Sequence, residues 1–366
     1  MCAGAMSLFP AHTVLCKAMQ HVEPPMPAIV QMLNDTDPLV ARGYKALRSL
    51  VMVQNHSLLC ARGYCQANSS AYKNDCSHND DRIPVSIAPI HSVTKSVVAL
   101  LTGILVDRGL IAGVDQPLSD LLGTRSHYLD GNSSASQLTL HHLLSMTTGF
   151  LWRDARVGLE PMGGRMMQQS DWVGFALSLP VTQGRTGSFQ YNSAVSHLLS
   201  VIIEEAAGVT ASAFAGENLF SPLGITEYEW ESDPQGISIG GWGLSLSPLS
   251  LAKLGQLCLD NGRHKSVQLV SAHWIQQMWT PHSEAKSLHG QSQPADYEVA
   301  GYGYQWWVRG NNTIRLYCAE GLGGQKILCI PDLRAVIVTS CDFSGRRTSL
   351  WPLIEQYWIP SLIESA

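Results

Sequence analysis

The chain has 366 residues, of which 45% are apolar and only 14% charged, and its formal net charge is −5. This composition excludes a disordered chain and predicts a well-buried globular protein, with one large domain or a few smaller ones. Because lysine and arginine are neither in excess nor clustered, nucleic acid is not expected as a partner.

The sequence shows no sign of a membrane span or an export signal. Its longest strongly apolar run, Val97 to Val106, is far shorter than the roughly 18 residues that a bilayer requires. Residues 1–10 lack a positively charged start, and Pro10 interrupts their apolar stretch. We therefore expect a cytoplasmic protein.

Neither a metal site nor a disulfide framework is indicated. The nine cysteines are dispersed without a paired C-x-x-C spacing, and the thirteen histidines show no H-E-x-x-H or similar ligand spacing. The cysteines are expected to be small buried apolar residues.

The first third of the chain is expected to contain an arm and a hairpin. Residues 1–40 are interpreted as an irregular arm with a short helix, because several prolines interrupt them. Leu50–Val53 and Ser57–Ala61 are predicted to form a β-hairpin around Gln54–His56. Residues 67–82, rich in Asn, Ser and Asp, are predicted to be a surface loop.

The segment His91-Ser92-Val93-Thr94-Lys95 leads into a long apolar helix that is predicted to end near Gly109. Ser92 and Lys95 are three residues apart, so they lie on one face of the helix. A neutral lysine beside a serine can take its proton and make it a nucleophile, which is the chemistry of the Ser-x-x-Lys signature. Taken alone, the spacing also fits a helix-capping serine and a surface lysine.

Residues 124–236 are predicted to form a separate, mainly helical lobe. Its helices are expected at Gln137–Met146, Asp171–Leu179, Ala194–Ala207 and Ala211–Leu219.

The last third is expected to return to mixed structure. Helices are expected at Leu246–Asp260, Ala272–Trp279 and Leu350–Tyr357, and strands at Gly303–Val308, Thr313–Cys318, Lys326–Ile330 and Ala335–Ser340. Strands at both ends of the chain predict an α+β fold, in which one antiparallel sheet from both chain ends is flanked by helices. Residues 41–123 and 237–366 would then form the α/β domain around the inserted lobe.

A further motif, Phe189–Ser193, precedes the helix at Ala194. Together with Ser92–Lys95, Leu143–Gly149, Leu219–Ile225 and Gly240–Leu244, it makes the chain from about residue 45 onward resemble the class C β-lactamase-like serine hydrolases. This superfamily contains penicillin-binding DD-peptidases, family VIII esterases and 6-aminohexanoate-dimer hydrolases. The resemblance implies a β-lactamase/DD-peptidase-like fold.

The resemblance also implies that Tyr191 and Ser193 form a second wall of the site. The unperturbed pKa of a phenol, near 10, is too high for a general base, but a neighbouring Lys95 ammonium would favour the phenolate and lower that pKa. Lys95 and Tyr191 would then take the proton of Ser92 and return it to the leaving group. An ordinary half-buried aromatic residue is the alternative for Tyr191.

The third motif of the family, Lys-Thr-Gly or His-x-Gly, has no literal counterpart. The corresponding segment, Ala319–Gln325, resembles a glycine-rich variant from the 6-aminohexanoate-dimer hydrolase branch. Gly321, Gly323 and Gly324 would let a substrate approach closely, and an N–H group within residues 316–325 would complete an oxyanion hole. A plain glycine turn is the alternative.

The substrate pocket is less well defined by the sequence. Trp152 is a candidate lining residue, with a core position as the alternative. Lys326 is the only cation beside the third motif, at its far edge, which argues against efficient β-lactam hydrolysis.

These features predict a serine hydrolase that cleaves a small-molecule ester or amide through an acyl-enzyme on Ser92, without a metal or organic cofactor. A β-lactamase or a DD-peptidase-type penicillin-binding protein is the alternative within the same fold. A non-catalytic binding or scaffold protein is the alternative from another class. No feature of the sequence indicates an oligomeric state.

Overall fold

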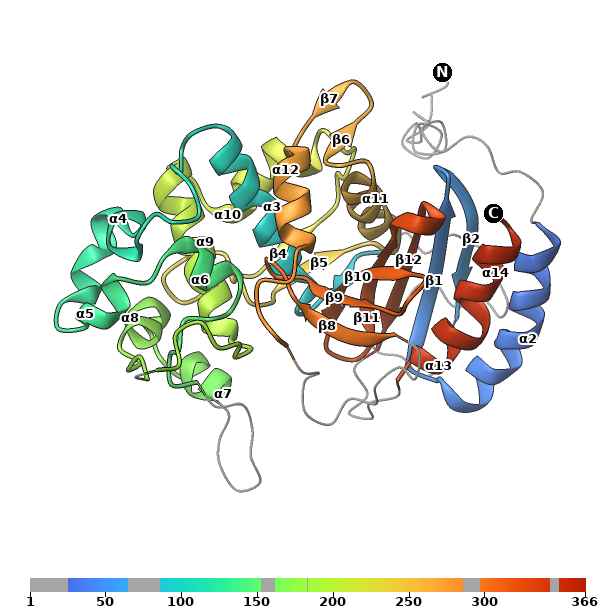
Figure 1. Cartoon of the computed structure of the whole chain (residues 1–366), viewed down its shortest axis with the longest axis horizontal. Coiled ribbons are helices and arrows are strands. Elements are labelled where there is room, and N and C mark those ends of the chain that lie inside the picture. Colours follow the sequence, from blue (N-terminus) through green and yellow to red (C-terminus); the bar gives the residue numbers. More distant parts are fainter. Residues whose placement is uncertain (1–25, 65–85, 153–161, 183, 286–296, 343–348) are drawn as a thin grey trace, which may run out of the picture.

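A seven-stranded antiparallel sheet forms one half of the molecule (Figure 1). The computed structural model describes residues 26–64, 86–152, 162–182, 184–285, 297–342 and 349–366, so the loop predicted at 67–82 lies outside the described residues. The strands follow the order β2-β1-β12-β11-β10-β9-β8. They are β1 (Leu47–Gln54), β2 (Ser57–Gly63), β8 (Glu298–Tyr302), β9 (Trp307–Gly310), β10 (Arg315–Gly321), β11 (Gln325–Ile330) and β12 (Ala335–Cys341).

The centre of the sheet joins the two ends of the chain. β1 pairs with its hairpin partner β2 on one side and with β12 on the other, where Val51 lies opposite Val338. The turn between β1 and β2 uses Asn55 and His56 with φ of +49° and +65°, the left-handed geometry that suits a tight hairpin. The predicted α+β fold, with an antiparallel sheet made from both chain ends, is confirmed.

Helices cover both faces of this sheet. Val51 and Val338 point into one core together with α3 and α11, whereas Leu50 and Ile337 point into a second core together with α2 and the C-terminal helix. Figure 1 shows α2 and α14 lying against the outer face. The helices of the α/β half are α2 (Pro27–Gly43), α3 (Val93–Asp107), α11 (Pro248–Leu259), α12 (Ala272–Trp279), α13 (Trp351–Leu353) and α14 (Ile359–Glu364), the last two joined by a π-helical turn (Ile354–Trp358).

Of residues 1–40, expected to be an irregular arm with a short helix, residues 1–25 lie outside the described residues, and most of the rest belongs to a long helix. α2 has 17 residues and tolerates Pro38 in its interior. Its Ile29, Met32 and Val40 are buried in the second core. This periodic apolar face, rather than the prolines, decides the local structure.

The helical lobe lies on the other side of α3 from the sheet (Figure 1). Its principal helix, α9 (Ser193–Ala207), begins where the Asn192 side chain accepts hydrogen bonds from two backbone N–H groups, and it ends at Gly208 with φ +71°. The shorter helices of the lobe are α4 (Leu118–Leu121), α5 (Ser133–Ser136), α6 (Leu140–Leu144), α7 (Met162–Met167), α8 (Trp172–Leu177) and α10 (Ala211–Ala215).

One lobe helix is shorter than predicted. The segment Gln137–Met146 is helical only over the five residues of α6, because the Thr139 side chain caps its start and Met146 turns the chain with φ +56°. This turn directs the following residues toward the Tyr191 segment, where the Gln190 N–H donates to the Met146 carbonyl at 2.9 Å.

α3 passes between the lobe and the sheet and is buried from Val93 to Leu105. Gly103 leaves space for Trp274, since a Cβ at this glycine would lie 2.2 Å from the indole Cδ1. The Trp274 indole N–H donates to the Ala99 carbonyl at 2.9 Å. This close packing fixes the helix whose first turn carries Ser92 and Lys95.

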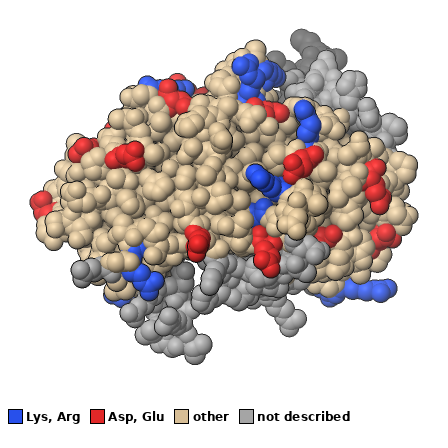
Figure 2. All heavy atoms as spheres, viewed as in Figure 1, with Lys and Arg blue, Asp and Glu red and all other residues tan. Residues whose placement is uncertain are grey.

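Within the described residues, no single helix has both the length and the apolar character to cross a membrane. α9 and the segment Ala211–Phe220 meet the criteria only when taken together, by length and composition, and they are bent by 73° relative to each other. On the face seen in Figure 2, lysine and arginine side chains are interspersed with aspartate and glutamate rather than gathered in one basic patch.

A cluster of half-buried histidines connects α6 to the α/β half. His141 Nδ1 lies 2.8 Å from the Tyr304 hydroxyl, and the His282 ring stacks on Tyr304 with 4.1 Å between centroids. Burial lowers the pKa of His141, His142 and His282, and for the first two the nearby Asp115 opposes this effect.

The cluster predicts acid-sensitive stability. A histidine with a depressed pKa in the folded state stabilises the fold above its unfolded pKa, about 6.5, and this contribution is lost as pH falls toward the folded value. We expect the Tm to decrease as pH is lowered from 7.5 to 5.5, and the decrease to be smaller in His141→Gln. Thermal unfolding followed by circular dichroism measures both slopes, and equal slopes in the two proteins would contradict this prediction.

Candidate active site

Ser92 stands at the junction between a turn and α3. Before it, β3 (Ala88–Pro89) pairs with β5 (Leu244–Leu246), and His91 then reverses the chain with φ +49°. The Ser92 side chain makes no capping hydrogen bond to the helix. The Thr94 hydroxyl donates to the His91 carbonyl at 2.7 Å instead. The Ser92 hydroxyl is therefore available to a partner other than the helix backbone.

That partner is Lys95, which lies one helical turn further along α3. Its Nζ donates to the Ser92 Oγ at 3.1 Å. The lysine is only 1% exposed, although lysines are rarely buried without a partner. The structure thus brings together the two residues that the Ser-x-x-Lys spacing predicted.

A second acceptor for Lys95 was not found by sequence reasoning. The Nζ also donates to the backbone carbonyl of Gly241 at 2.5 Å. A Cβ at Gly241 would lie 2.8 Å from the Ser193 carbonyl, so only glycine allows this loop to lie so close to α9. The two adjacent glycines at 240–241 were the sequence feature that could have indicated this contact. A backbone carbonyl acceptor, however, does not depend on a particular side chain, so no motif identifies it.

Tyr191 faces the same lysine from the residue before the α9 cap. Lys95 Nζ lies over the Tyr191 ring, 5.0 Å from its centroid. The ring also stacks on Trp307 at 5.9 Å and meets Tyr302 edge-on at 6.4 Å. Burial raises the pKa of Tyr302 well above 10, and Tyr191 and Glu320 raise it further, so Tyr302 stays protonated and neutral beside Tyr191. The predicted trio Ser92, Lys95 and Tyr191 therefore lies together.

Ser193, the third residue of the tyrosine motif, is the first residue of α9 and is partly exposed. It packs against Gly241, because a Cβ at that glycine would lie 3.1 Å from the Ser193 Cβ. This contact places Ser193 beside Gly241, whose carbonyl accepts the hydrogen bond from Lys95 Nζ.

The glycine-rich segment forms the turn between β10 and β11. Gly321 pairs with Gln325, and the turn between them uses Gly323 and Gly324 with φ of +89° and +113°, values that favour glycine. A Cβ at Gly321 would lie 2.4 Å from the Ile90 carbonyl, so the end of β10 touches the segment before Ser92.

β10 also presents an open edge at this end. β9 pairs with residues 315–318 of β10 and leaves residues 319–321 without a strand partner on that side within the described chain. Unpaired backbone groups at a strand edge can bind an extended ligand. The open edge and the Ser92 turn therefore meet at Gly321.

The cation nearest this segment is held in a buried cluster. Lys326 Nζ lies 3.3 Å and Arg309 Nε 3.1 Å from the Glu320 carboxylate, and both cations lie over the Trp351 ring. Burial raises the pKa of Glu320, but the charges of Lys326 and Arg309 outweigh that effect and hold it below its usual value. Lys326 is thus paired with Glu320, and sequence reasoning did not anticipate this cluster.

Trp152 is almost fully buried. Its side chain is 2% exposed and belongs to the core that the helical lobe shares with α3 and one face of the sheet, while its backbone carbonyl accepts a hydrogen bond from the Gln190 side chain. Its connection to the site runs through Gln190, which precedes Tyr191, and a substrate contact stays a prediction. Within the described residues, no group of three metal-binding side chains is present.

An antiparallel sheet with a helical lobe, and a serine–lysine pair on the helix between them, is the architecture of the β-lactamase-like serine hydrolases. The family model described as Beta-lactamase matches residues 84–355, well over half of the chain, and the protein belongs to this family.

Known relatives agree with this assignment. The 6-aminohexanoate-dimer hydrolase of Paenarthrobacter ureafaciens is 24% identical over 276 residues, and the match covers 71% of this chain and 67% of that protein. The octameric penicillin-binding protein homologue from Pyrococcus abyssi has a TM-score of 0.68 at 20% identity, covering 91% of this chain and 77% of its own. EstCE1, a hydrolase with promiscuous acyltransferase activity, has a TM-score of 0.67 at 13% identity. The match covers 89% of this chain and 97% of EstCE1. At these identities, the two solved structures establish the shared fold.

Proposed function

We propose that this protein hydrolyses a carboxylic ester or a small amide through an acyl-enzyme on Ser92, with Lys95 and Tyr191 transferring protons. The observation that carries the proposal is the 3.1 Å hydrogen bond between Lys95 Nζ and Ser92 Oγ, made by a lysine that is 1% exposed. A base within hydrogen-bond distance of a hydroxyl can take its proton as the hydroxyl attacks.

The reaction follows from these positions. Ser92 Oγ attacks the carbonyl carbon of the substrate, and its proton passes to the Lys95–Tyr191 pair. When the tetrahedral intermediate collapses, the bond to the leaving oxygen or nitrogen breaks and the pair returns the proton to it. Water then attacks the acyl-enzyme by the same route, releasing the acid and restoring the Ser92 hydroxyl.

The oxyanion is assigned to the N–H groups of Ser92 and Leu322. Neither N–H donates a backbone hydrogen bond within the described residues. The contact between Gly321 and the Ile90 carbonyl brings their two segments side by side. Two N–H donors aimed at the developing charge would stabilise the intermediate strongly, since removing one such donor typically lowers kcat by roughly 10²- to 10³-fold.

The surroundings favour a small, uncharged acyl group. Phe189, Tyr302 and Trp307 form an aromatic cluster around Tyr191. Lys326 is engaged by Glu320, which supports an ester or amide rather than a carboxylate-bearing β-lactam. The resemblance to a 6-aminohexanoate-dimer hydrolase supports a short linear amide as the other candidate, although the dimer itself carries an ammonium and a carboxylate.

Acyl-enzyme trapping tests the proposal. The protein is mixed with p-nitrophenyl butyrate, with 6-aminohexanoate dimer and with a chromogenic β-lactam, and product release and intact mass are followed. We expect p-nitrophenol release and an acyl adduct on the peptide containing Ser92, with neither in Ser92→Ala. Reaction with the β-lactam alone would move the assignment to a β-lactamase or penicillin-binding protein. No adduct with any probe would favour a non-catalytic role.

A further inference from the structure

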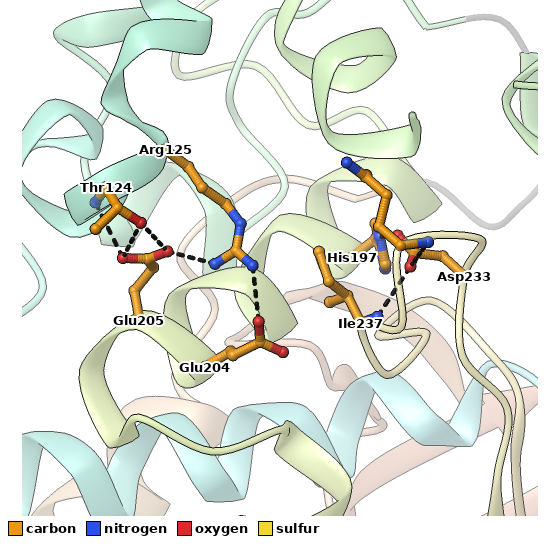
Figure 3. A network of polar contacts seen from close by, with 8 residues as sticks. Thr124, Arg125, His197, Glu204, Glu205, Asp233 and Ile237 are labelled. Carbon is orange, nitrogen blue, oxygen red and sulfur yellow. Dashed lines mark hydrogen bonds and ion pairs between the residues drawn. The ribbon is translucent and has the colours of Figure 1, made fainter. Parts of the chain in front are cut away.

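A buried hydrogen-bonded pair of side chains, distinct from the proposed catalytic groups, connects α9 to the loop before Gly241. His197 Nε2 lies 3.0 Å from Asp233 Oδ2, and both side chains are 0% exposed. Asp233 Oδ1 accepts from the N–H groups of Gln235 and Ile237, both at 2.9 Å. Figure 3 shows the carboxylate between His197 and the loop. The Asp233 carboxylate therefore stabilises the turn of the loop through Oδ1 and connects the loop to α9 through Oδ2.

The pair is more elaborate than packing alone requires. Burying a histidine and a carboxylate is expensive, and apolar residues of the same volume often stabilise a core equally well. Burial raises the pKa of Asp233, but the hydrogen bonds from His197, Ile237 and Gln235 outweigh it and hold the pKa below its usual value. His197 Nδ1 is buried and has no hydrogen-bond partner in the described part of the chain.

The same loop touches α9 a second time, one turn closer to Tyr191. A Cβ at Gly240 would lie 2.1 Å from the Ser196 carbonyl, and one at Gly241 would lie 2.8 Å from the Ser193 carbonyl. Between these contacts and Asp233, the two sides of the loop are joined by a hydrogen bond, which the Ile239 N–H donates to the Glu231 carbonyl at 2.9 Å. The loop is therefore held against α9 at two places, at Asp233 and at Gly240–Gly241.

We propose that His197 and Asp233 are positioning residues that hold the Gly241 carbonyl, and through it Lys95, in place for proton transfer. The link is direct, because the Gly241 carbonyl accepts from Lys95 Nζ at 2.5 Å while the same Nζ donates to Ser92. This inference rests on the proposed role of Lys95 as the base. In this proposal the pair acts on the lysine through the loop that carries Gly241.

The test compares Asp233→Asn, His197→Phe and His197→Gln on p-nitrophenyl butyrate. Asp233→Asn and His197→Phe are expected to lower kcat about 10- to 100-fold at nearly unchanged KM, the size expected from a displacement of about 1 Å. His197→Gln retains an N–H donor toward Asp233 and should recover most of kcat. The matched control is Glu205→Gln on the same helix, which removes the ion pair with Arg125 and alters the hydrogen bond that Glu205 accepts from Thr124 (Figure 3), and which should leave kcat unchanged.

A second readout does not depend on turnover. In protein labelled with [15N]lysine, the Nζ resonance of Lys95 is assigned by its absence from Lys95→Met. It should shift in Asp233→Asn and His197→Phe, and stay in place in Glu205→Gln. A shift in a protein that hydrolyses neither the ester nor the amide probe would support the link between the pair and Lys95 while rejecting the proposed function. An unmoved Lys95 resonance, or variants that lose only Tm and keep kcat, would overturn the inference.

Discussion

Replacing Lys95 by methionine is expected to lower kcat for ester hydrolysis by about 10²- to 10⁴-fold, the contribution typical of general acid–base catalysis. Methionine keeps an unbranched apolar stem in the buried position and removes the amine that contacts both Ser92 Oγ and the Gly241 carbonyl. KM should change little, because the amine acts on the proton of the serine rather than on the substrate. Steady-state kinetics with p-nitrophenyl butyrate measure the effect.

Lys253→Met is the matched control. Lys253 also donates from Nζ to a glycine carbonyl, that of Gly224, at 2.8 Å, but it lies on α11 away from Ser92. Its replacement should leave kcat unchanged. A loss of less than tenfold in Lys95→Met, with the protein folded by near-ultraviolet circular dichroism, would mean that Ser92 is activated by another group.

The largest stability effect is expected for Glu320→Ala. This change leaves the two cations of the cluster, Arg309 and Lys326, side by side in a buried position over Trp351. Removing one partner of a buried ion pair typically lowers the free energy of unfolding by about 3–5 kcal/mol, since the remaining charge is desolvated without compensation. Urea denaturation, with ΔG of unfolding extrapolated to water, measures the change.

Two comparisons make this prediction specific. Glu204→Ala breaks an ion pair that is partly exposed, since the Glu204 side chain is 21% and the Arg125 side chain 25% exposed. This change should lower the free energy of unfolding by at most about 1 kcal/mol. Because the folded protein holds the pKa of Glu320 below its ordinary value of 4.5, the contribution of Glu320 to stability is present above pH 4.5 and is lost as the pH falls below it. The difference between wild type and Glu320→Ala should therefore shrink in acid, and a constant difference would show that the loss comes from packing alone.

Local patterns were enough to predict most of the fold. The hairpin turn at Asn55–His56, the glycine after α9 and the apolar runs of β11 and β12 are read from neighbouring residues, and the structure has the corresponding elements. The first part of the predicted strand, from Gly303 to Trp306, is not strand, because Gln305 has φ +61° and its side chain is buried among partners far away in the sequence.

Those partners illustrate what sequence reasoning cannot supply. The Gln305 amide donates to the Leu143 and Leu144 carbonyls and accepts from Ser196 Oγ, while its backbone carbonyl accepts from Ser96 Oγ. The contact between Lys95 and Gly241 spans 146 positions in the same way. The Ser92–Lys95 pair was visible because it is a local helical spacing. Tyr191 was recognised only through the family resemblance, and the carbonyl of Gly241 and the charges around Glu320 required the tertiary structure.

The sheet that unites the two chain ends has a consequence for how this protein folds during synthesis. Arg48 in β1 and Asp342 after β12 form an ion pair across 294 positions, and these two strands are adjacent in the sheet. β1 emerges from the ribosome early but cannot acquire its central partner until translation is almost finished. Closing so long a loop is entropically unfavourable and slows folding. Until β12 is synthesised, the β1 edge of the β1–β2 hairpin has no strand partner. Truncation before residue 335 should leave this apolar edge permanently unpaired and therefore prone to aggregation.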